Sequence, residues 1–437
     1  MEEHQINIRM FRPMESYQKY GGVLTFARSV GYAVVKKPEG YTTAKVDQII
    51  QENEKKSANE QQSTAKQYPN IITVVNETFA DIKVLGDFKT NEDYMPYFHS
   101  LKKNCVTGYT YASIVGGQTA NTEFELLTGN TLGFLSAGTT AFQLYIHGQM
   151  PSLVSNLKAE GYSGNKAMHP FNPYNYNRPA VYKDFGFTDF IDKFDFPKNV
   201  KRVREYISDE ANVDRIISEY EKNRKKTDQP FYMYNMTIQN HSPYDKDAAN
   251  FKQPIKIESS KYDAEANRYL NLIKYSDDSL KQLTSYFEKC KEPTIILFLG
   301  DHQPRLTDEF MNKITNGQYQ TWSSEQMMKR YQVPFVIWAN YDIKEQHIEK
   351  TSMNYIQSIL TKTAGVKMTG YQRFLNEVRK EVPTITSQGY WGKNGKFYQI
   401  NDKGSPYYGI IQKYRMIQYN MMFDKKNRRD SFFEVSK

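Results

Sequence analysis

The chain has 437 residues, of which 39% are hydrophobic, a formal net charge of +9 and only two cysteines, Cys105 and Cys290. It has no run near the about 18 apolar residues that span a bilayer, and its first residues lack the features of a signal peptide. We therefore expect a cytosolic protein or a soluble piece of a longer one. The cysteines exclude metal and redox motifs, and we favour two buried thiols over one disulfide. The basic residues are scattered, without zinc-finger or RNP-type motifs, which favours anionic membranes or polymers over nucleic acid as partners.

The first part of the chain, residues 1–67, is predicted to be an arm and a linker. Residues 1–45 carry turn signals, and residues 44–50 have the pattern of one amphipathic helix. The rest, up to residue 67, is polar and reads as a linker. We place the main domain boundary just before Tyr68.

From residue 68 onward, strand-like runs alternate with helical patterns. The runs at 71–75, 231–238, 294–299 and 333–338 predict strands, and helices are expected near 120–129, 150–160, 200–223, 263–288 and 352–362. This alternation predicts an α/β fold with a doubly wound, mostly parallel sheet over residues 68–382. Residues 383–437 look like a small appended subdomain, with a helix or strand at 410–422. The basic segment 424–430 is expected to be a solvated tail, with a membrane-surface role as the second interpretation.

Acidic and histidine side chains follow two of the apolar runs directly. Glu77 comes after the run at 71–75, and Asp301 and His302 come after the run at 294–299. Ligands of open α/β sheets collect outside the carboxyl ends of the strands. Carboxylate and imidazole donors together suit manganese, zinc or iron better than calcium. The sequence therefore predicts a metal or phosphate site at this edge.

A threonine at the start of a predicted helix could supply a nucleophile. Thr119 follows Gly116 and Gly117, and Thr122 with Glu125 fits a capping box. The helix dipole favours negative charge near Thr119. A threonine hydroxyl needs a metal or a base to react, which the predicted cation site could provide. The alternative is that Thr119 is only a cap or turn residue.

Two further histidines fall in polar loops or at strand ends. His169 lies in a turn-rich segment with Tyr176 and Arg178, and His241 directly follows the run at 231–238. Arg178 could bind a phosphate with two hydrogen bonds, and Tyr176 could stack on a glycerol or a sugar. His241 could protonate a leaving group. Taken singly, each histidine is more often a surface residue, but the placement of His169, His241 and His302 in loops or at strand ends favours a function.

These segments together resemble a known family. The chain is similar over residues 68–425 to the extracellular catalytic domain of lipoteichoic acid synthases and related phosphoglycerol transferases, within the alkaline phosphatase/sulfatase superfamily. The segments that carry the resemblance are Pro69-Asn70-Ile71-Ile72, Asn76-Glu77-Thr78-Phe79, Gln118-Thr119, Glu123-Phe124, His169, Asn177-Arg178, Val181 to Phe187, Asn240-His241-Ser242-Pro243-Tyr244, Gly300-Asp301-His302 and Val333-Pro334-Phe335.

The resemblance implies a sulfatase-like fold and a role for each site residue. Thr119 would be the nucleophile and also a metal ligand. The remaining ligands would be Glu77, Asp301 and His302, around manganese or else magnesium or zinc. The phosphoglycerol group would be held by His169, Arg178 and His241, with His241 as the candidate acid. The chain has Tyr176 where members often have Trp, and Gly117-Gln118 where they often have Lys or Gly-Lys.

The expected reaction is metal-dependent transfer of phosphoglycerol from phosphatidylglycerol, through a covalent intermediate on Thr119. The expected acceptor is a growing lipoteichoic acid-type polymer or a glycolipid. One alternative is a transferase that decorates a cell-wall polysaccharide with glycerol phosphate, and another is a non-catalytic domain that binds teichoic-acid-like polymers. A sulfatase is disfavoured because its formylglycine precursor is Cys or Ser.

The resemblance also implies a location. The protein is expected on the extracellular face of a Gram-positive cell membrane. Transmembrane helices would precede this chain, and residues 1–67 would form a juxtamembrane arm.

Overall fold

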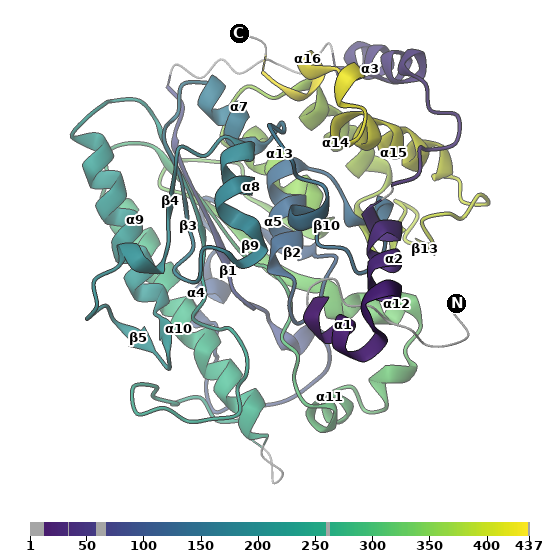
Figure 1. Ribbon diagram of the computed structural model, residues 1–437. Coiled ribbons are helices and arrows are strands. Elements are labelled where there is room, and N and C mark those ends of the chain that lie inside the picture. Colours follow the sequence, from purple (N-terminus) through teal and green to yellow (C-terminus); the bar gives the residue numbers. More distant parts are fainter. Residues whose placement is uncertain (1–12, 34, 58–66, 259–262, 436–437) are drawn as a thin grey trace.

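The computed structural model describes residues 13–33, 35–57, 67–258 and 263–435, and its centre is an eight-stranded sheet (Figure 1). The strand order is β10-β2-β9-β8-β1-β7-β3-β4, and β9 is antiparallel to both of its neighbours while the other pairs are parallel. The strands are β1 (Asn70–Asn76), β2 (Cys105–Tyr111), β3 (Ser163–Met168), β4 (Asp189–Ile191), β7 (Phe231–Met236), β8 (Thr294–Gly300), β9 (Gln332–Ala339) and β10 (Gln346–Ser352). The predicted α/β fold with a mostly parallel sheet is confirmed.

The four predicted strands are the four central strands of this sheet, in the order β9-β8-β1-β7. β1, β7 and β8 are buried along their whole length, and β9 is buried except at its first residue. Burial on both faces explains their continuous apolar sequences. The missed strands β10-β2 and β3-β4 occupy the two edges, where polar sequences such as that of β10 leave part of the strand exposed.

Helices cover both faces of the sheet (Figure 1). One layer contains α5, α7, α8 and α13, and the other contains α4, α9 and α10. The helices are α1 (Pro13–Tyr20), α2 (Gly22–Ala33), α3 (Thr43–Ser57), α4 (Pro96–Ser100), α5 (Thr119–Thr128), α6 (Ala141–Leu144), α7 (Leu153–Ala159), α8 (Arg178–Phe185), α9 (Asp209–Arg224), α10 (Ala264–Phe287), α11 (Asp308–Ile314), α12 (Ser324–Met327), α13 (Met353–Thr363), α14 (Gly370–Glu381), α15 (Tyr408–Met422) and α16 (Asp430–Phe433). Within the described residues, no helix combines the length and the apolar character needed to cross a bilayer.

One expected helix begins later than predicted, and one segment left open between helix and strand is a helix. The helix predicted from residue 200 begins only at Asp209, where the Ser208 hydroxyl accepts a hydrogen bond from the Ala211 N–H and caps the helix. The preceding residues form a small hairpin of β5 (Arg202–Val203) and β6 (Tyr206–Ile207). The segment 410–422, predicted as helix or strand, lies inside helix α15.

The amino-terminal arm packs on the carboxyl-terminal part of the chain. Helix α3 continues to Ser57, beyond the predicted helix, so the linker prediction is wrong for residues 51–57, while residues 58–66 lie outside the described part. The helix contacts α14 and α15 (Figure 1). Its Val46 and Ile49 are buried in the core. The boundary predicted before Tyr68 stays a prediction.

The carboxyl-terminal segment is not a solvated tail, as we had expected. Arg429 donates two hydrogen bonds to the Asp47 carboxylate of α3, at 2.6 and 2.8 Å. Phe432 and Phe433 of α16 are buried in the core, which holds the segment against the protein. The small antiparallel sheet of β11 (Thr384–Thr386), β12 (Gly389–Trp391) and β13 (Phe397–Tyr398) precedes α15. A boundary at residue 383 remains a prediction.

The two cysteines are not paired with each other. Cys105 is buried at the start of β2, and Cys290 is partly buried after α10. Both are free thiols, as predicted, although Cys290 is not fully buried as the prediction had it.

Candidate functional site

Three predicted metal ligands meet at the carboxyl edge of the sheet. Strands β1 and β8 are parallel neighbours and pair Asn76 with Gly300, so the residues that follow them come side by side. One ligand atom from each of Glu77, Asp301 and His302 lies within 4.8 Å of the others, and all three residues are buried. A Cβ atom on Gly300 would lie 1.8 Å from the Phe79 carbonyl oxygen, so the close approach of the two strand ends requires glycine here.

The free atoms of this group fit a divalent cation. His302 Nδ1 donates to the Gln303 carbonyl at 3.0 Å, which leaves Nε2 unprotonated and 3.2 Å from Asp301 Oδ2. Both of these facing atoms are buried without a hydrogen-bond partner among the described residues. Burial lowers the pKa of His302 and so keeps the imidazole neutral, as a metal ligand must be. Burial raises the pKa of Asp301 to about 7, and a bound cation would favour its charged form.

Thr119 is the first residue of α5 and lies beside this group. Gln118, just before it, has a left-handed backbone with φ 64°. The hydroxyl of Thr119 is one of the hydrogen-bond donors that lower the pKa of Asp301 against the effect of burial. The start of α5 is tied to the end of β8 because the Thr122 hydroxyl donates to the Asp301 carbonyl at 2.8 Å.

The predicted capping box is therefore wrong. Thr122 lies inside α5 rather than before it. Glu125 accepts hydrogen bonds from the Ser113 hydroxyl and the Leu132 N–H at 2.7 and 2.9 Å, and so it fastens the far end of the helix.

A cavity of about 310 Å³ opens beside Glu77 and Thr119. It collects every substrate residue predicted from the sequence, together with residues that the sequence had not indicated. Its wall is formed by Glu77, Thr119, Gln143, His169, Phe171, Tyr174, Asn175, Tyr176, Arg178, Ile238 and His241. Asp301 and His302, which lie next to Glu77, are not among the residues of this wall.

Arg178 is held in the wall by a partner whose role sequence reasoning had not assigned. Its Nε and Nη2 atoms both donate to Glu123 Oε1, at 3.1 and 2.7 Å, and both side chains are buried. The other oxygen of Glu123 accepts from the hydroxyls of Tyr182 and Tyr234. Burial acts to lower the pKa of Arg178, but the attraction of Glu123 outweighs it and the pKa is raised. Tyr176 stacks on the guanidinium with 5.0 Å between Cζ and the ring centroid.

The two histidines of the cavity are oriented by backbone carbonyls. His169 Nδ1 donates to the Met236 carbonyl at 3.0 Å, and burial keeps the pKa of this imidazole well below its usual value. His241 Nδ1 donates to the Ser242 carbonyl at 2.6 Å. Each ring therefore keeps Nε2 available for a ligand.

Arg204 fixes the loop that carries His241. Its guanidinium donates to the carbonyls of Gln239, His241 and Pro243 at 2.9, 2.7 and 2.7 Å. It comes from the turn between β5 and β6, the segment that had been expected to be helical. No sequence motif pointed to it, because its function depends on a contact made about 35 residues along the chain.

A second buried network supports the strand ends from behind. Asn76 Nδ2 donates to Asp209 Oδ2 at 2.7 Å, and the Ser276 hydroxyl donates to the same oxygen at 2.6 Å. Asn240 Nδ2 donates to Asn76 Oδ1 at 3.1 Å. Burial raises the pKa of Asp209 to about 6. This network joins β1, α9 and α10 to the loop that precedes His241.

The fold and this site define a member of the sulfatase family, and the chain belongs to it: the family model matches residues 69–366. The resemblance inferred from the sequence is confirmed at this level.

Two curated proteins and one solved structure are among those similar to this chain. A Rhizobium meliloti (strain 1021) protein named for cyclic beta-1,2-glucan modification is 30% identical over 97% of this chain and 65% of its own length. The Lipoteichoic acid synthase-like YvgJ of Bacillus subtilis (strain 168) is 27% identical over 53% of this chain and 36% of its own length. The solved structure of the Streptococcus pyogenes phosphoglycerol transferase GacH, in complex with sn-glycerol-1-phosphate, has a TM-score of 0.74 at 20% identity and covers 92% of this chain and 100% of that one. The chain thus spans 65% or less of these two curated relatives.

Proposed function

We propose that the protein is a metal-dependent transferase that moves phosphoglycerol from phosphatidylglycerol, through Thr119, to a hydroxyl acceptor. The observation that carries this proposal is the cavity whose wall contains Thr119, the guanidinium of Arg178, and Glu77 of the cation-binding group. Phosphoryl transfer needs this combination of a placed nucleophile and positive charge around the phosphate. The names of the relatives support phosphoglycerol as the group transferred.

The phosphate is bound before the chemistry begins. Arg178 is placed to hold the non-bridging oxygens, the Nε2 atom of His169 is placed to accept a hydrogen bond from a glycerol hydroxyl, and Tyr176 offers its ring to the glycerol carbons. When bound at Glu77, Thr119, Asp301 and His302, a divalent cation supplies Lewis acidity, which lowers the pKa of a hydroxyl and neutralises charge on phosphoryl oxygens. Manganese is our proposed ion, with magnesium or zinc as alternatives.

In the first step Thr119 Oγ1 attacks phosphorus and releases its proton to solvent. The Oγ1–P bond forms as the bond from phosphorus to the diacylglycerol oxygen breaks. Protonated His241 gives its proton to that leaving oxygen. The products are diacylglycerol and a phosphoglycerol ester of Thr119.

In the second step the acceptor hydroxyl attacks the same phosphorus. Neutral His241 accepts the hydroxyl proton, the Oγ1–P bond breaks, and Thr119 regains a proton from solvent. The acceptor leaves with a glycerol phosphodiester. This scheme places the protein at the outer face of a membrane, close to its lipid donor, and a Gram-positive source remains a prediction.

Two acceptors deserve separate tests. The prediction from the sequence is a growing glycerol phosphate polymer or a glycolipid. The second candidate is a glycan hydroxyl, favoured by the relative that matches 97% of the chain and is named for glucan modification. Loading Thr119 with phosphoglycerol and adding either a glycerol phosphate oligomer or a cyclic glucan tests this directly, because the true acceptor removes the adduct.

Mass spectrometry of the protein after incubation with manganese and phosphatidylglycerol tests the first step. We expect a phosphoglycerol adduct on the peptide that contains Thr119, together with released diacylglycerol. Thr119→Ala should abolish both, whereas Thr321→Ala, which changes an exposed threonine outside the cavity, should retain both.

The proposal fails if the parent protein gives neither adduct nor diacylglycerol and Thr119→Ala behaves as the parent does. Polymer binding that persists in that case, and that is insensitive to a chelator, would favour the non-catalytic binding domain.

A further inference from the structure

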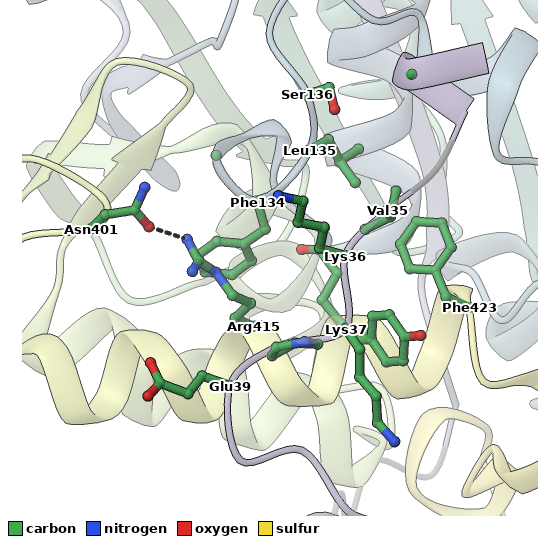
Figure 2. A pocket seen from close by; sticks show the side chains of 15 residues that line it. Val35, Lys36, Lys37, Glu39, Phe134, Leu135, Ser136, Asn401, Arg415 and Phe423 are labelled. Atoms are coloured by element: carbon green, nitrogen blue, oxygen red, sulfur yellow. Dashed lines mark hydrogen bonds between the residues drawn. The ribbon is translucent and has the colours of Figure 1, made fainter.

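A second cavity, of about 400 Å³, lies between the amino-terminal arm and α15 (Figure 2). Its wall is formed by residues 35–39 of the arm, residues 133–136 after α5, and side chains of α15. It shares no lining residue with the cavity at Thr119. It is therefore a separate place at which a ligand could bind.

The cavity contains a guanidinium, that of Arg415, which has no acidic partner among the residues that the structure describes. Arg415 donates to the side-chain oxygen of Asn401 at 2.9 Å and lies over the ring of Phe134, 5.1 Å from its centroid. Its Nε atom is buried and has no hydrogen-bond partner within the described ranges. By contrast, Lys413 and Arg429 nearby in the sequence both pair with carboxylates of α3. A guanidinium in the wall of a cavity, with no carboxylate among the described residues to balance its charge, favours an anionic ligand there.

Lys36 supplies a second cation in the wall of the same cavity. Figure 2 shows its side chain reaching from the arm toward Phe134, the ring on which Arg415 lies, while Lys37 points away from that ring. The Glu39 carboxylate forms an ion pair with Lys403, with 3.3 Å between Oε2 and Nζ. The wall also contains apolar and aromatic side chains, with Tyr419 and Phe423 among them, beside polar ones such as Gln418.

This combination suits a phosphodiester that carries glycerol or sugar carbons. A guanidinium binds phosphate oxygens with paired hydrogen bonds, and an ammonium adds a point charge. The apolar and aromatic side chains provide a surface for the carbon atoms on either side of the phosphate. The volume is within the range of small-molecule sites and exceeds what a bare inorganic ion needs.

The two cavities are joined by one short segment. Ser136 lines the second cavity and Gln143 lines the first, so seven residues span at most about 25 Å between them. Asn121, two residues after Thr119, holds this segment through the Thr139 carbonyl at 2.8 Å and the Ala141 N–H at 2.9 Å. A chain of a few phosphodiester units could reach from one cavity to the other.

We propose that the cavity at Lys36 and Arg415 binds a phosphodiester of the acceptor or product chain while the end of that chain lies at Thr119. The role in transfer rests on the proposed function, but the binding itself does not. The site would recognise the charge and the flanking carbons of a glycerol phosphate unit.

Fluorescence anisotropy with a labelled glycerol phosphate oligomer tests the binding, using Thr119→Ala protein so that nothing is transferred. We expect the double variant Lys36→Gln/Arg415→Gln to raise Kd by about tenfold or more, because two charge-assisted contacts are lost. The control Lys225→Gln/Lys396→Gln removes the same charge from exposed positions and should leave Kd within about twofold. Equal losses in both double variants, or no loss in either, would overturn the proposal.

Vesicles of phosphatidylcholine with phosphatidylglycerol separate the two sources of a phosphodiester. If Lys36→Gln/Arg415→Gln weakens vesicle binding and leaves oligomer binding unchanged, the cavity serves the membrane and the proposal is wrong. Circular dichroism checks folding, and if Arg415→Gln does not fold, Lys36→Gln alone should raise the oligomer Kd about threefold, and no change would overturn the proposal.

The adduct on Thr119 distinguishes the two proposals. With Thr119 restored, Lys36→Gln/Arg415→Gln should form the adduct from phosphatidylglycerol as the parent does, since the donor does not need the second cavity. Absence of the adduct in the parent contradicts the proposed function, whereas a normal adduct with unaltered oligomer binding in the variant contradicts only the second site.

Discussion

Arg204 controls the position of His241 through three backbone carbonyls rather than through the substrate. We expect Arg204→Gln to lower kcat for the first step by about tenfold to a hundredfold, since a small displacement of a catalytic group costs that much. The KM for phosphatidylglycerol should change little, because Arg178 and His169 are untouched. Steady-state kinetics across pH would measure both constants.

The control for this variant lies on the same hairpin. Arg202 is exposed and donates to the Glu205 carbonyl at 2.9 Å. Arg202→Gln should keep the parent kcat, and Arg204→Lys should fall between the two. Equal effects of Arg202→Gln and Arg204→Gln would mean that Arg204 acts only through general stability.

Titration of Glu125, which is not one of the proposed metal ligands, should make the unfolding free energy depend on pH. Burial raises its pKa to about 7, although hydrogen bonds from Leu132 and Ser113 oppose the shift. Because the folded-state pKa lies above the unfolded value, its stabilising contribution is complete below about pH 4.5 and is lost as pH rises through about 7. Glu125→Gln should therefore reduce the fall in unfolding free energy between pH 5 and 7.5 by about 1 kcal/mol per unit.

Urea unfolding at several pH values, with a chelator present, measures this slope. Glu54→Gln, at an exposed position of α3, is the matched control and should keep the parent slope. An unchanged slope in Glu125→Gln would show that Glu125 is charged throughout this range in the folded protein.

At the scale of elements, α3 is attached by its apolar face more than by its ion pairs. Ile49 is 2% exposed, whereas Asp47 and Arg429 are both partly exposed. Ile49→Ala should lower the unfolding free energy by about 2–5 kcal/mol, because it leaves a cavity in the core. Asp47→Asn should cost less than about 1 kcal/mol, because solvent screens an exposed pair. Chemical denaturation of the two variants gives the comparison, and a larger loss for Asp47→Asn would contradict this view of the interface.

The strands that were predicted correctly are those whose buried residues form a continuous apolar run in the sequence. The central strands β1, β7, β8 and β9 are apolar runs and were all predicted. The edge strands were missed because their polar residues resemble a loop. The hairpin β5–β6 was predicted to be the first part of helix α9. Two residues per strand are too few to show the alternation of polar and apolar residues that indicates a strand.

At the scale of the whole molecule, a manganese ion bound by Glu77, Asp301 and His302 should stabilise the folded protein. Manganese at a hundredfold excess over its Kd should raise the unfolding free energy by about 2.7 kcal/mol if it binds only the folded state. Thermal unfolding with manganese, and again after a chelator, measures the shift. Asp301→Asn should remove the manganese-dependent shift, and Asp228→Asn, at a fully exposed position, should keep it. A shift that persists in Asp301→Asn would place the ion elsewhere.

The sequence by itself determined the class of fold, the family and the candidate site residues Glu77, Asp301, His302 and Thr119. These could be predicted because strand ends and helix starts are local features, and parallel strands bring their carboxyl ends to one edge. Only the tertiary structure decided which distant groups hold those residues in place. Arg178 pairs with Glu123, and Arg204 donates hydrogen bonds to the loop of His241. Each of these contacts joins segments that are separated by tens of residues. The packing of the arm on α15 joins an early and a late segment of the chain, and the second cavity exists only because those two segments meet. Such contacts depend on how the chain closes in space, which no local pattern of residues records.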